Sequence, residues 1–264
     1  MYQFGYHKPG SLAEAAALLA DNEDAKLLAG GQTYIPTLKQ RLAQPSDLID
    51  LGAIAELRGI REEAGGLTIG AMTRHGEVAE SDVVERVIPG LAMLAHVIGD
   101  PQVRNTGTLG GSISNNDPAS DYPGALIGLG ATVRTDKREI PAEQFFTGMF
   151  ETALAREEIV TAVHFPRPEK SGYAKFRNPA SRYAIVGVFV ARTGGGVRVA
   201  VTGAGPCVFR WTAAEQALGG NFSAGALDGL TADASGLNSD IHASAEYRAN
   251  LIKVMAKRAV EAAA

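Results

Sequence analysis

The chain has 264 residues, of which 45 % are hydrophobic and 20 % charged, and its formal net charge is −4. This composition is typical of a globular protein with a substantial apolar core, and the length suits one large domain or two of ordinary size. No cluster of Lys and Arg is dense enough to bind a row of phosphates and no apolar run is long enough to span a membrane, so we expect neither nucleic acid binding nor a membrane span.

Cysteine and histidine usage limits the metal chemistry of the chain. Cys207 is the single cysteine, which excludes an internal disulfide and a cysteine-ligated iron–sulfur cluster held by this chain alone. The five histidines show neither HxxxH nor HExxH spacing, so we expect no metal site. The first twenty residues lack a basic segment followed by an apolar core, so no signal peptide is indicated and we expect a cytoplasmic location.

The first half of the chain alternates short apolar runs with helical patterns. Residues 11–20 predict a helix, with Ser11 as N-cap and Glu14 completing a capping box. The apolar run 26–29 predicts a strand, which Gly30-Gly31 follows. A helix is then predicted from apolar residues at helical spacing: Ile35, Leu38 and Leu42. Further strands are predicted at 48–51 and 67–71, and a helix at 83–97 with a break at Pro89-Gly90.

The second half begins after a strand predicted at 157–165. Residues 166–170 read as a linker, so we expect the chain to divide near residue 168. Strands are predicted at 183–191 and 197–201, and helices at 213–218 and 243–263. One face of the last helix is expected to carry four large side chains: Tyr247, Leu251, Val254 and Met255. The stretch VAVTGAG at 199–205 contains GxG but no third glycine, and is interpreted as a strand entering a turn.

Two glycine loops carry the chemistry. Gly30-Gly31-Gln32-Thr33 lies between a predicted strand and a helix start, where unpaired backbone N–H groups and the helix dipole favour an anion. The loop TGTLGGS at 106–112 repeats this pattern and adds hydroxyl groups. Because glycine has no Cβ, the backbone of both loops can approach a phosphate closely. The residues alone leave two interpretations open: a clamp for the two phosphates of a dinucleotide, or two tight turns that need glycine.

Three stretches together resemble the FAD-binding medium subunit of molybdenum hydroxylases, the carbon monoxide dehydrogenase/xanthine dehydrogenase family. They are AGGQT at 29–33, QVRNTGTLGGSISNNDPASD at 102–121 and EEIVTAV at 157–163. The resemblance implies an α+β protein. A two-part FAD-binding domain of the vanillyl-alcohol oxidase (PCMH) type would cover residues 1–167, with its two subdomains split near 55–60. A smaller α+β C-terminal domain would cover 168–264, in which Asp240, Tyr247-Arg248 and Arg258 resemble the family's last helix region.

The resemblance also implies roles for individual residues. Both glycine loops would contact the FAD pyrophosphate, and Asp121 would bind the adenosine ribose. Tyr183 would lie beside the flavin ring, and Lys175 would be the basic residue near it, with Arg177 as a competitor for that role. Arg182 stands where some relatives carry an acidic residue. His75 is either a cleft residue or an ordinary core residue. The complete predicted FAD site is Leu28, Ala29, Gly30, Gly31, Gln32, Thr33, Tyr34, Ile98, Thr108, Gly110, Gly111, Ser112, Asp121, Val160, Lys175 and Tyr183.

The function implied is that of an electron-transfer subunit with noncovalent FAD and no catalytic acid or base of its own. A large subunit would carry the molybdenum cofactor and a small subunit two [2Fe–2S] clusters, in a dimer of heterotrimers. The external acceptor would be NAD, a quinone or dioxygen. Two alternatives are a stand-alone FAD oxidase or reductase, which needs its own acid/base pair, and a non-enzymatic nucleotide-binding module, which predicts no bound flavin.

Overall fold

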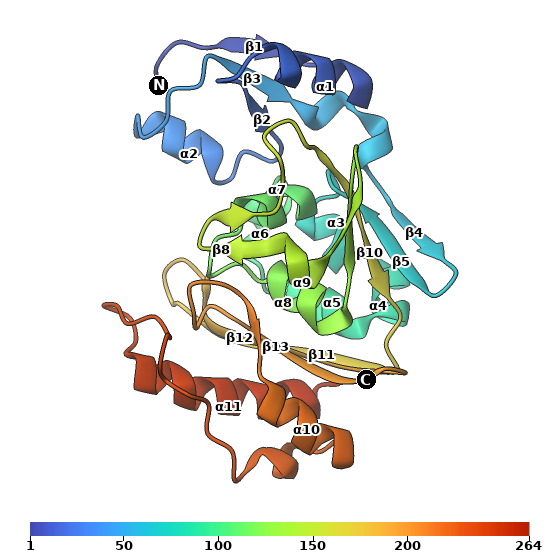
Figure 1. Cartoon of the computed structure of the whole chain (residues 1–264), viewed down its shortest axis with the longest axis vertical. Helices are drawn as coiled ribbons and strands as arrows, with labels where there is room; N and C mark the ends of the chain where they lie inside the picture. The colour runs from blue at the N-terminus through green and yellow to red at the C-terminus, as the bar shows by residue number, and fades with distance from the viewer. Residues whose placement is uncertain (264) are drawn as a thin grey trace.

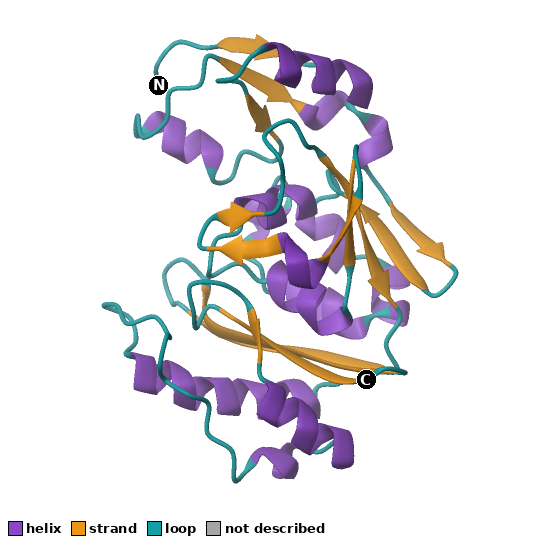
Figure 2. Ribbon diagram, in the orientation of Figure 1, coloured by secondary structure: helices purple, strands orange, loops and turns teal. Residues whose placement is uncertain are grey.

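The computed structural model describes residues 1–263, and these form three layers stacked along the long axis of the molecule (Figure 1). A small N-terminal sheet lies at one end, a five-stranded sheet with helices lies in the middle, and a four-stranded sheet with two helices lies at the other end (Figure 2). No helix of the described residues is both long and apolar enough to cross a membrane.

The N-terminal layer is a three-stranded parallel sheet in the order β1-β3-β2. Its elements are β1 (Gly5–His7), α1 (Leu12–Asp21), β2 (Lys26–Leu28), α2 (Tyr34–Lys39), β3 (Asp47–Asp50) and the 3₁₀ turns η1 (Leu51–Ala53) and η2 (Ala55–Leu57). Ser11 caps α1 as predicted, but the Glu14 carboxylate accepts from the N–H of Gly10 instead of closing the capping box on Ser11. The α2 helix ends before Leu42, which lies exposed, because Arg41 adopts a left-handed φ of 61°.

The middle layer is an antiparallel sheet in the order β4-β5-β10-β6-β7, and α3 to α9 surround it. The strands are β4 (Ile60–Glu63), β5 (Gly66–Gly70), β6 (Thr132–Thr135), β7 (Glu139–Pro141) and β10 (Val160–Pro166), and β8 (Phe146–Gly148) pairs separately with β9 (Glu151–Thr152). The helices are α3 (His75–Ala79), α4 (Asp82–Val87), α5 (Pro89–His96), α6 (Pro101–Arg104), α7 (Leu109–Asn115), α8 (Tyr122–Leu129) and α9 (Ala142–Phe145). The predicted break at Pro89 is confirmed, since Pro89 begins α5.

The C-terminal layer is an antiparallel sheet, β11-β12-β13-β14, covered on one side by α10 and α11. The elements are β11 (Lys170–Arg177), β12 (Ala184–Thr193), β13 (Gly196–Thr202), β14 (Phe209–Arg210), α10 (Thr212–Gly220), the 3₁₀ turn η3 (Ala224–Leu227) and α11 (Ala245–Glu261). Both faces of β12 are buried: Val188 and Val190 pack toward α10 and α11, and Phe189 packs toward α8. The run that begins at Val199 ends in a turn at Gly203, as predicted.

The buried face of α11 differs from the predicted one. Leu251 and Met255 are buried, but Tyr247 is exposed, and Arg248 lies inside instead. Arg248 is buried because its guanidinium binds the carbonyl oxygens of Ile185 and Gly203 at the ends of two strands. A pattern of apolar residues does not reveal such an inward-facing arginine, and the helix is rotated accordingly.

Candidate functional site

A cavity of about 390 Å³ lies where the N-terminal and middle layers meet, with the β11–β12 loop at one side. Of the sixteen residues predicted from the sequence to form one site, fifteen line this cavity and Lys175 does not. Segments as distant in sequence as 26–34, 107–121 and 181–183 therefore meet around one space.

The two glycine loops touch each other. A Cβ placed on Gly30 would lie 2.1 Å from the carbonyl oxygen of Thr106 and 2.8 Å from the Cα of Gly107. The amide of Gln32 also donates a hydrogen bond to the hydroxyl of Thr106. Glycine is required at position 30 because no side chain fits between the two backbones.

The first loop offers free backbone donors. No described residue accepts a hydrogen bond from the backbone N–H groups of residues 30–34. The next residue along the chain, Ile35, donates its N–H to the carbonyl oxygen of Gly31. Gly31 has a φ of 70°, in the left-handed region, which glycine adopts without strain. Consecutive unpaired N–H groups of this kind form a concave binding site for an anion.

The second loop differs from its predicted role as a second set of donors. The N–H groups of Leu109 and Gly110 bind the carbonyl oxygens of Thr73 and Ala71, and the N–H of Gly111 binds the hydroxyl of Thr108. These bonds fasten the loop to the segment that follows β5. The second loop thus supplies a close-fitting backbone wall and hydroxyl groups, while the first loop supplies the N–H donors.

His75 contacts the second loop and helps to hold it in place. The backbone N–H of His75 donates a hydrogen bond to the carbonyl oxygen of Gly107. Its ring lies so close that a Cβ placed on Gly107 would be 2.6 Å from Nε2. Burial, with a contribution from Arg104, lowers the pKa of His75 to about 4, so the ring is neutral at pH 7. The two interpretations of His75 are therefore both correct in part, because it is a buried residue that also lines the cavity.

Asp121 and Lys175 form a buried ion pair. The Lys175 ammonium lies 2.9 Å from Oδ1 and 3.0 Å from Oδ2 of Asp121, and the Tyr173 hydroxyl donates to Oδ1 at 2.5 Å. The side chains of Lys175 and Asp121 are 2 % and 6 % exposed. Burial raises the pKa of the Asp121 carboxyl, while Lys175 and Tyr173 act against that rise.

This ion pair changes the roles expected for Asp121 and Lys175 in the FAD site. Lys175 lies behind Asp121 and not in the cavity wall, so Asp121 stands between it and any ligand there. Arg177, the competitor for the basic role, is exposed at the end of β11 and does not line the cavity. Asp121 lines the cavity but already shares both carboxylate oxygens with protein donors.

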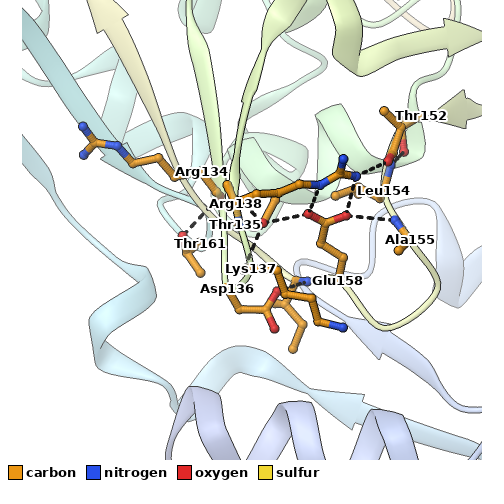
Figure 3. Close-up of polar contacts among 12 residues, drawn as sticks. Arg134, Thr135, Asp136, Lys137, Arg138, Thr152, Leu154, Ala155, Glu158 and Thr161 are labelled. Atoms are coloured by element: carbon orange, nitrogen blue, oxygen red, sulfur yellow. Dashed lines mark hydrogen bonds and ion pairs between the residues drawn. The ribbon is translucent and has the colours of Figure 1, made fainter.

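A polar network holds the segment that leads into β10 (Figure 3). The Glu158 carboxylate, whose side chain is 1 % exposed, accepts from Nε and Nη2 of Arg138, from the Thr135 hydroxyl and from the N–H of Ala155. Asp136 accepts the N–H of Ile159. Strand β10 therefore begins three residues later than predicted, and Ile159 and Val160 are fixed against the cavity.

Because of this network, we expect the free energy of unfolding to fall at acidic pH. Its hydrogen bonds, those from Arg138 first, lower the pKa of Glu158 from 4.5 to about 2. A depressed carboxyl pKa stabilises the fold fully above the unfolded value, and this stabilisation is lost as the pH falls from about 4.5 toward 2. We expect Glu158→Gln to lower the free energy of unfolding by about 2 kcal/mol at pH 7, with a smaller difference from wild type at pH 3.

Urea denaturation at several pH values measures this difference. Glu157→Gln is the matched control, because the neighbouring Glu157 is 40 % exposed and pairs only with surface cations. It should change stability by less than about 0.5 kcal/mol. A Glu158→Gln effect that stays constant from pH 7 to pH 3 would contradict the assigned role.

Several residues that line the cavity are not among those predicted from the sequence. Ser114 and Asn115 lie three and four residues after Gly111 on α7, so helical spacing places them on the same face. Met72 and Ile159 lie beside the ends of β5 and β10, and join the N-terminal apolar cluster under the cavity. No local signal in the sequence identifies these last two, because only the pairing of β5 with β10 brings them together.

Comparison with known proteins identifies the family of this chain. Residues 2–168 match the family of FAD binding domains in molybdopterin dehydrogenases, and residues 171–263 match the carbon monoxide dehydrogenase flavoprotein C-terminal domain. The chain is 36 % identical to the carbon monoxide dehydrogenase medium chain of Hydrogenophaga pseudoflava, covering 99 % of this chain and 97 % of that one. It is also 36 % identical to the nicotine 6-hydroxylase medium subunit of Paenarthrobacter nicotinovorans, covering 97 % and 95 %.

Comparison with solved structures supports the same family. The fold matches carbon monoxide dehydrogenase from Hydrogenophaga pseudoflava with a TM-score of 0.89 at 37 % identity, over 99 % of this chain and 97 % of that one. It matches quinoline 2-oxidoreductase from Pseudomonas putida 86 with a TM-score of 0.88 at 30 % identity, over 98 % and 96 %. Fold and sequence thus define an FAD-binding oxidoreductase subunit. More specifically, the chain belongs to the FAD-binding medium subunits of molybdenum hydroxylases, as its three resembling stretches predict.

Proposed function

We propose that this chain is the electron-transfer subunit of a molybdenum hydroxylase complex, in which FAD takes electrons from [2Fe–2S] clusters of a small partner subunit and passes them to an external acceptor. The observation that supports this most directly is the row of free N–H groups at residues 30–34, in a loop that lines one cavity together with the second glycine loop. Bound FAD supplies the exchange of one and two electrons, and the chain supplies binding and orientation.

We propose the following arrangement of the site. The N–H groups of the first loop hold the pyrophosphate against the backbone of Gly110 and Gly111, with the hydroxyls of Thr108 and Ser112 beside it. Tyr183 lies along the flavin ring, and Ile98 and Val160 provide apolar contacts. Asp121 accepts from a sugar hydroxyl with its remaining lone pairs, and Lys175 acts on the cofactor only through Asp121.

The domain boundaries are part of the proposal. We place the FAD-binding domain at 1–167, with its subdomains meeting near 55–60, and the C-terminal domain at 168–264. Three apolar clusters support this division, although Met72 and Ile159 of the middle layer join the N-terminal cluster. The middle cluster also includes residues of the C-terminal sheet that pack against the helices of the middle layer: Tyr173, Phe189, Ala191 and Ala200. Strand β10 ends at Pro166 and β11 begins at Lys170, so the proposed boundary lies in the short connection between them.

The partners are proposed from the division of chemistry. Among the described residues, no group of three or more His, Cys, Asp or Glu could hold a metal ion, and Cys207 is the single cysteine of the chain. The relatives are named as medium chains or subunits, which supports a large molybdenum-cofactor subunit and a small iron–sulfur subunit beside this one. We propose a dimer of such heterotrimers in the cytoplasm.

Expression of this chain alone tests the proposal. We expect a yellow protein that retains FAD through gel filtration but does not reduce its flavin with hydroxylase substrates such as purines or N-heterocycles. Adding reduced iron–sulfur partner subunit should reduce the flavin. Flavin reduction by a small substrate without any partner would favour a stand-alone oxidase, and a colourless protein that does not bind added FAD would favour a non-enzymatic module.

A further inference from the structure

The N-terminal layer, residues 1–57, is attached to the rest of the molecule at few points (Figure 1). The chain passes from this layer to the middle layer only once, in the segment that leads from η2 to β4. Away from that segment, two hydrogen bonds of the described residues join the two layers. One runs from the Gln32 amide to the Thr106 hydroxyl, and the other from Arg156 Nη1 to the carbonyl oxygen of Asn22 at 3.3 Å. Because the layer has its own sheet and most of an apolar cluster within itself, it can move as a unit.

The connecting segment 57–59 is fixed to the middle layer. The N–H of Met72 donates a hydrogen bond to the carbonyl oxygen of Leu57, and the N–H of Gly59 donates one to the Thr73 hydroxyl at 3.0 Å. Gly59 has a φ of 102°, which glycine adopts without strain, and a Cβ placed there would meet no atom within 4 Å. At Gly59 the segment is therefore anchored by hydrogen bonds without close packing around it, which suits the pivot of a moving layer.

Arg156 extends from a rigid turn of the middle layer to the N-terminal layer. The turn that carries it is closed by Glu158, whose carboxylate and backbone N–H both bond to the backbone of Ala155 (Figure 3). On the other side, the side chain of Asn22 donates a hydrogen bond to Asp47 of β3, which holds the neighbouring carbonyl oxygen in place. Both ends of the bond between Arg156 and Asn22 are therefore fixed, each within its own layer.

The cavity of the proposed FAD site is bounded by both layers. The N-terminal layer contributes residues 26–34 and Leu51 to its wall, and neither Arg156 nor Asn22 lines it. A cofactor that contacts both glycine loops is therefore enclosed between two layers that few hydrogen bonds join. Building on the proposed function, we propose that the N-terminal layer is a hinged lid, which opens about residues 57–59 to admit and release FAD, and that the bond from Arg156 to Asn22 is the latch that keeps it closed.

The latch has a kinetic effect that distinguishes it from a residue in contact with FAD. The lid is closed most of the time, and the latch bond is the same in the closed chain with and without FAD, because neither of its residues lines the cavity. Loss of the latch raises the energy of both closed states relative to the open one. Uptake and release of FAD then accelerate by the same factor, and the affinity does not change. A residue in contact with FAD instead changes the affinity, mainly through the rate of release.

Rapid mixing of the FAD-free chain with FAD, followed by flavin fluorescence, measures uptake, and dilution of the loaded chain measures release. As the FAD concentration rises, the observed rate of uptake should level off at the rate of lid opening, because FAD does not enter the closed form. In Arg156→Met, this plateau and the rate of release should each rise about 5-fold, the effect of one lost hydrogen bond. The Kd for FAD should stay within about 2-fold of the wild-type value.

Arg61→Met is the matched control. Arg61 is an exposed arginine of β4 that lines no part of the cavity, and no hydrogen bond of the described residues joins its side chain to the N-terminal layer. This variant should change neither the plateau, nor the rate of release, nor the Kd.

Thiol labelling measures the opening without FAD. Ile159 is 1 % exposed and packs in the N-terminal apolar cluster, so a cysteine at this position reacts with a thiol reagent only when the lid opens. In a chain that carries Cys207→Ala, the cysteine of Ile159→Cys should react about 5-fold faster when Arg156→Met is added.

Three results would each overturn the proposal: an uptake rate that stays linear in FAD concentration, unchanged rates in Arg156→Met, or a loss of affinity through faster release alone. Failure of the wild-type chain to bind FAD would instead contradict the proposed function. In that case the labelling of Ile159→Cys, with and without Arg156→Met, would still show whether the lid opens and whether Arg156 keeps it closed.

Discussion

Gly30→Ala is expected to remove most of the bound FAD from a chain that still folds. The added Cβ would lie 2.1 Å from the carbonyl oxygen of Thr106, which is a backbone atom and cannot rotate away. The two loops must therefore separate, at a cost typical of overpacking, about 1–3 kcal/mol. Because the proposed pyrophosphate site depends on the spacing of these loops, affinity for FAD should fall roughly 10- to 100-fold.

Fluorescence titration of the stripped protein with FAD measures this affinity. Gly219→Ala is the matched control, since a Cβ on Gly219 meets no atom within 4 Å and this residue lies far along the chain in α10. The control should bind FAD as tightly as wild type does. Unchanged FAD affinity in Gly30→Ala, with a normal melting temperature, would mean that the glycine loops do not form the pyrophosphate site.

Lys175→Met is expected to cause the largest loss of stability. It leaves the Asp121 carboxylate buried with only the Tyr173 hydroxyl as a side-chain partner. Removing one member of a buried ion pair costs about 3–5 kcal/mol. The pKa of Asp121, which burial already raises, should rise further without the ammonium group. Since a raised carboxyl pKa means that the folded state binds the proton more tightly, the loss should be greater at pH 8 than at pH 5.

The double variant Asp121→Asn, Lys175→Met separates the ion pair from simple packing. It removes both charges, so we expect it to recover at least half of the lost free energy of unfolding. Guanidinium chloride denaturation of the FAD-free protein measures the effect without any contribution from the cofactor. Additive losses in the double variant would show that Asp121 and Lys175 do not stabilise each other in the folded protein.

The sequence by itself determined the local elements and the two glycine loops. Ser11 caps a helix, Pro89 begins one, and the strand predicted at 183–191 is observed as Ala184–Thr193, all of which follow from residue type and spacing. Paired glycines after a short apolar run predict a backbone that a phosphate can approach closely. In the structure the close contact of Gly30 is with the facing loop, where a Cβ would collide. These signals are local, so a single sequence contains them.

Only the tertiary structure decided which partner each polar group has. Lys175 is placed behind Asp121 by the pairing of β11 with β12, and Arg248 is turned inward by the carbonyl oxygens at two strand ends. The second glycine loop uses its N–H groups on the segment after β5, which distinguishes its role from that of the first loop. Such pairings join residues dozens of positions apart, and their energies depend on burial, which periodicity does not specify. For this reason the sequence predicted most of the residues that line one cavity, and the fold determined which of their polar groups are free.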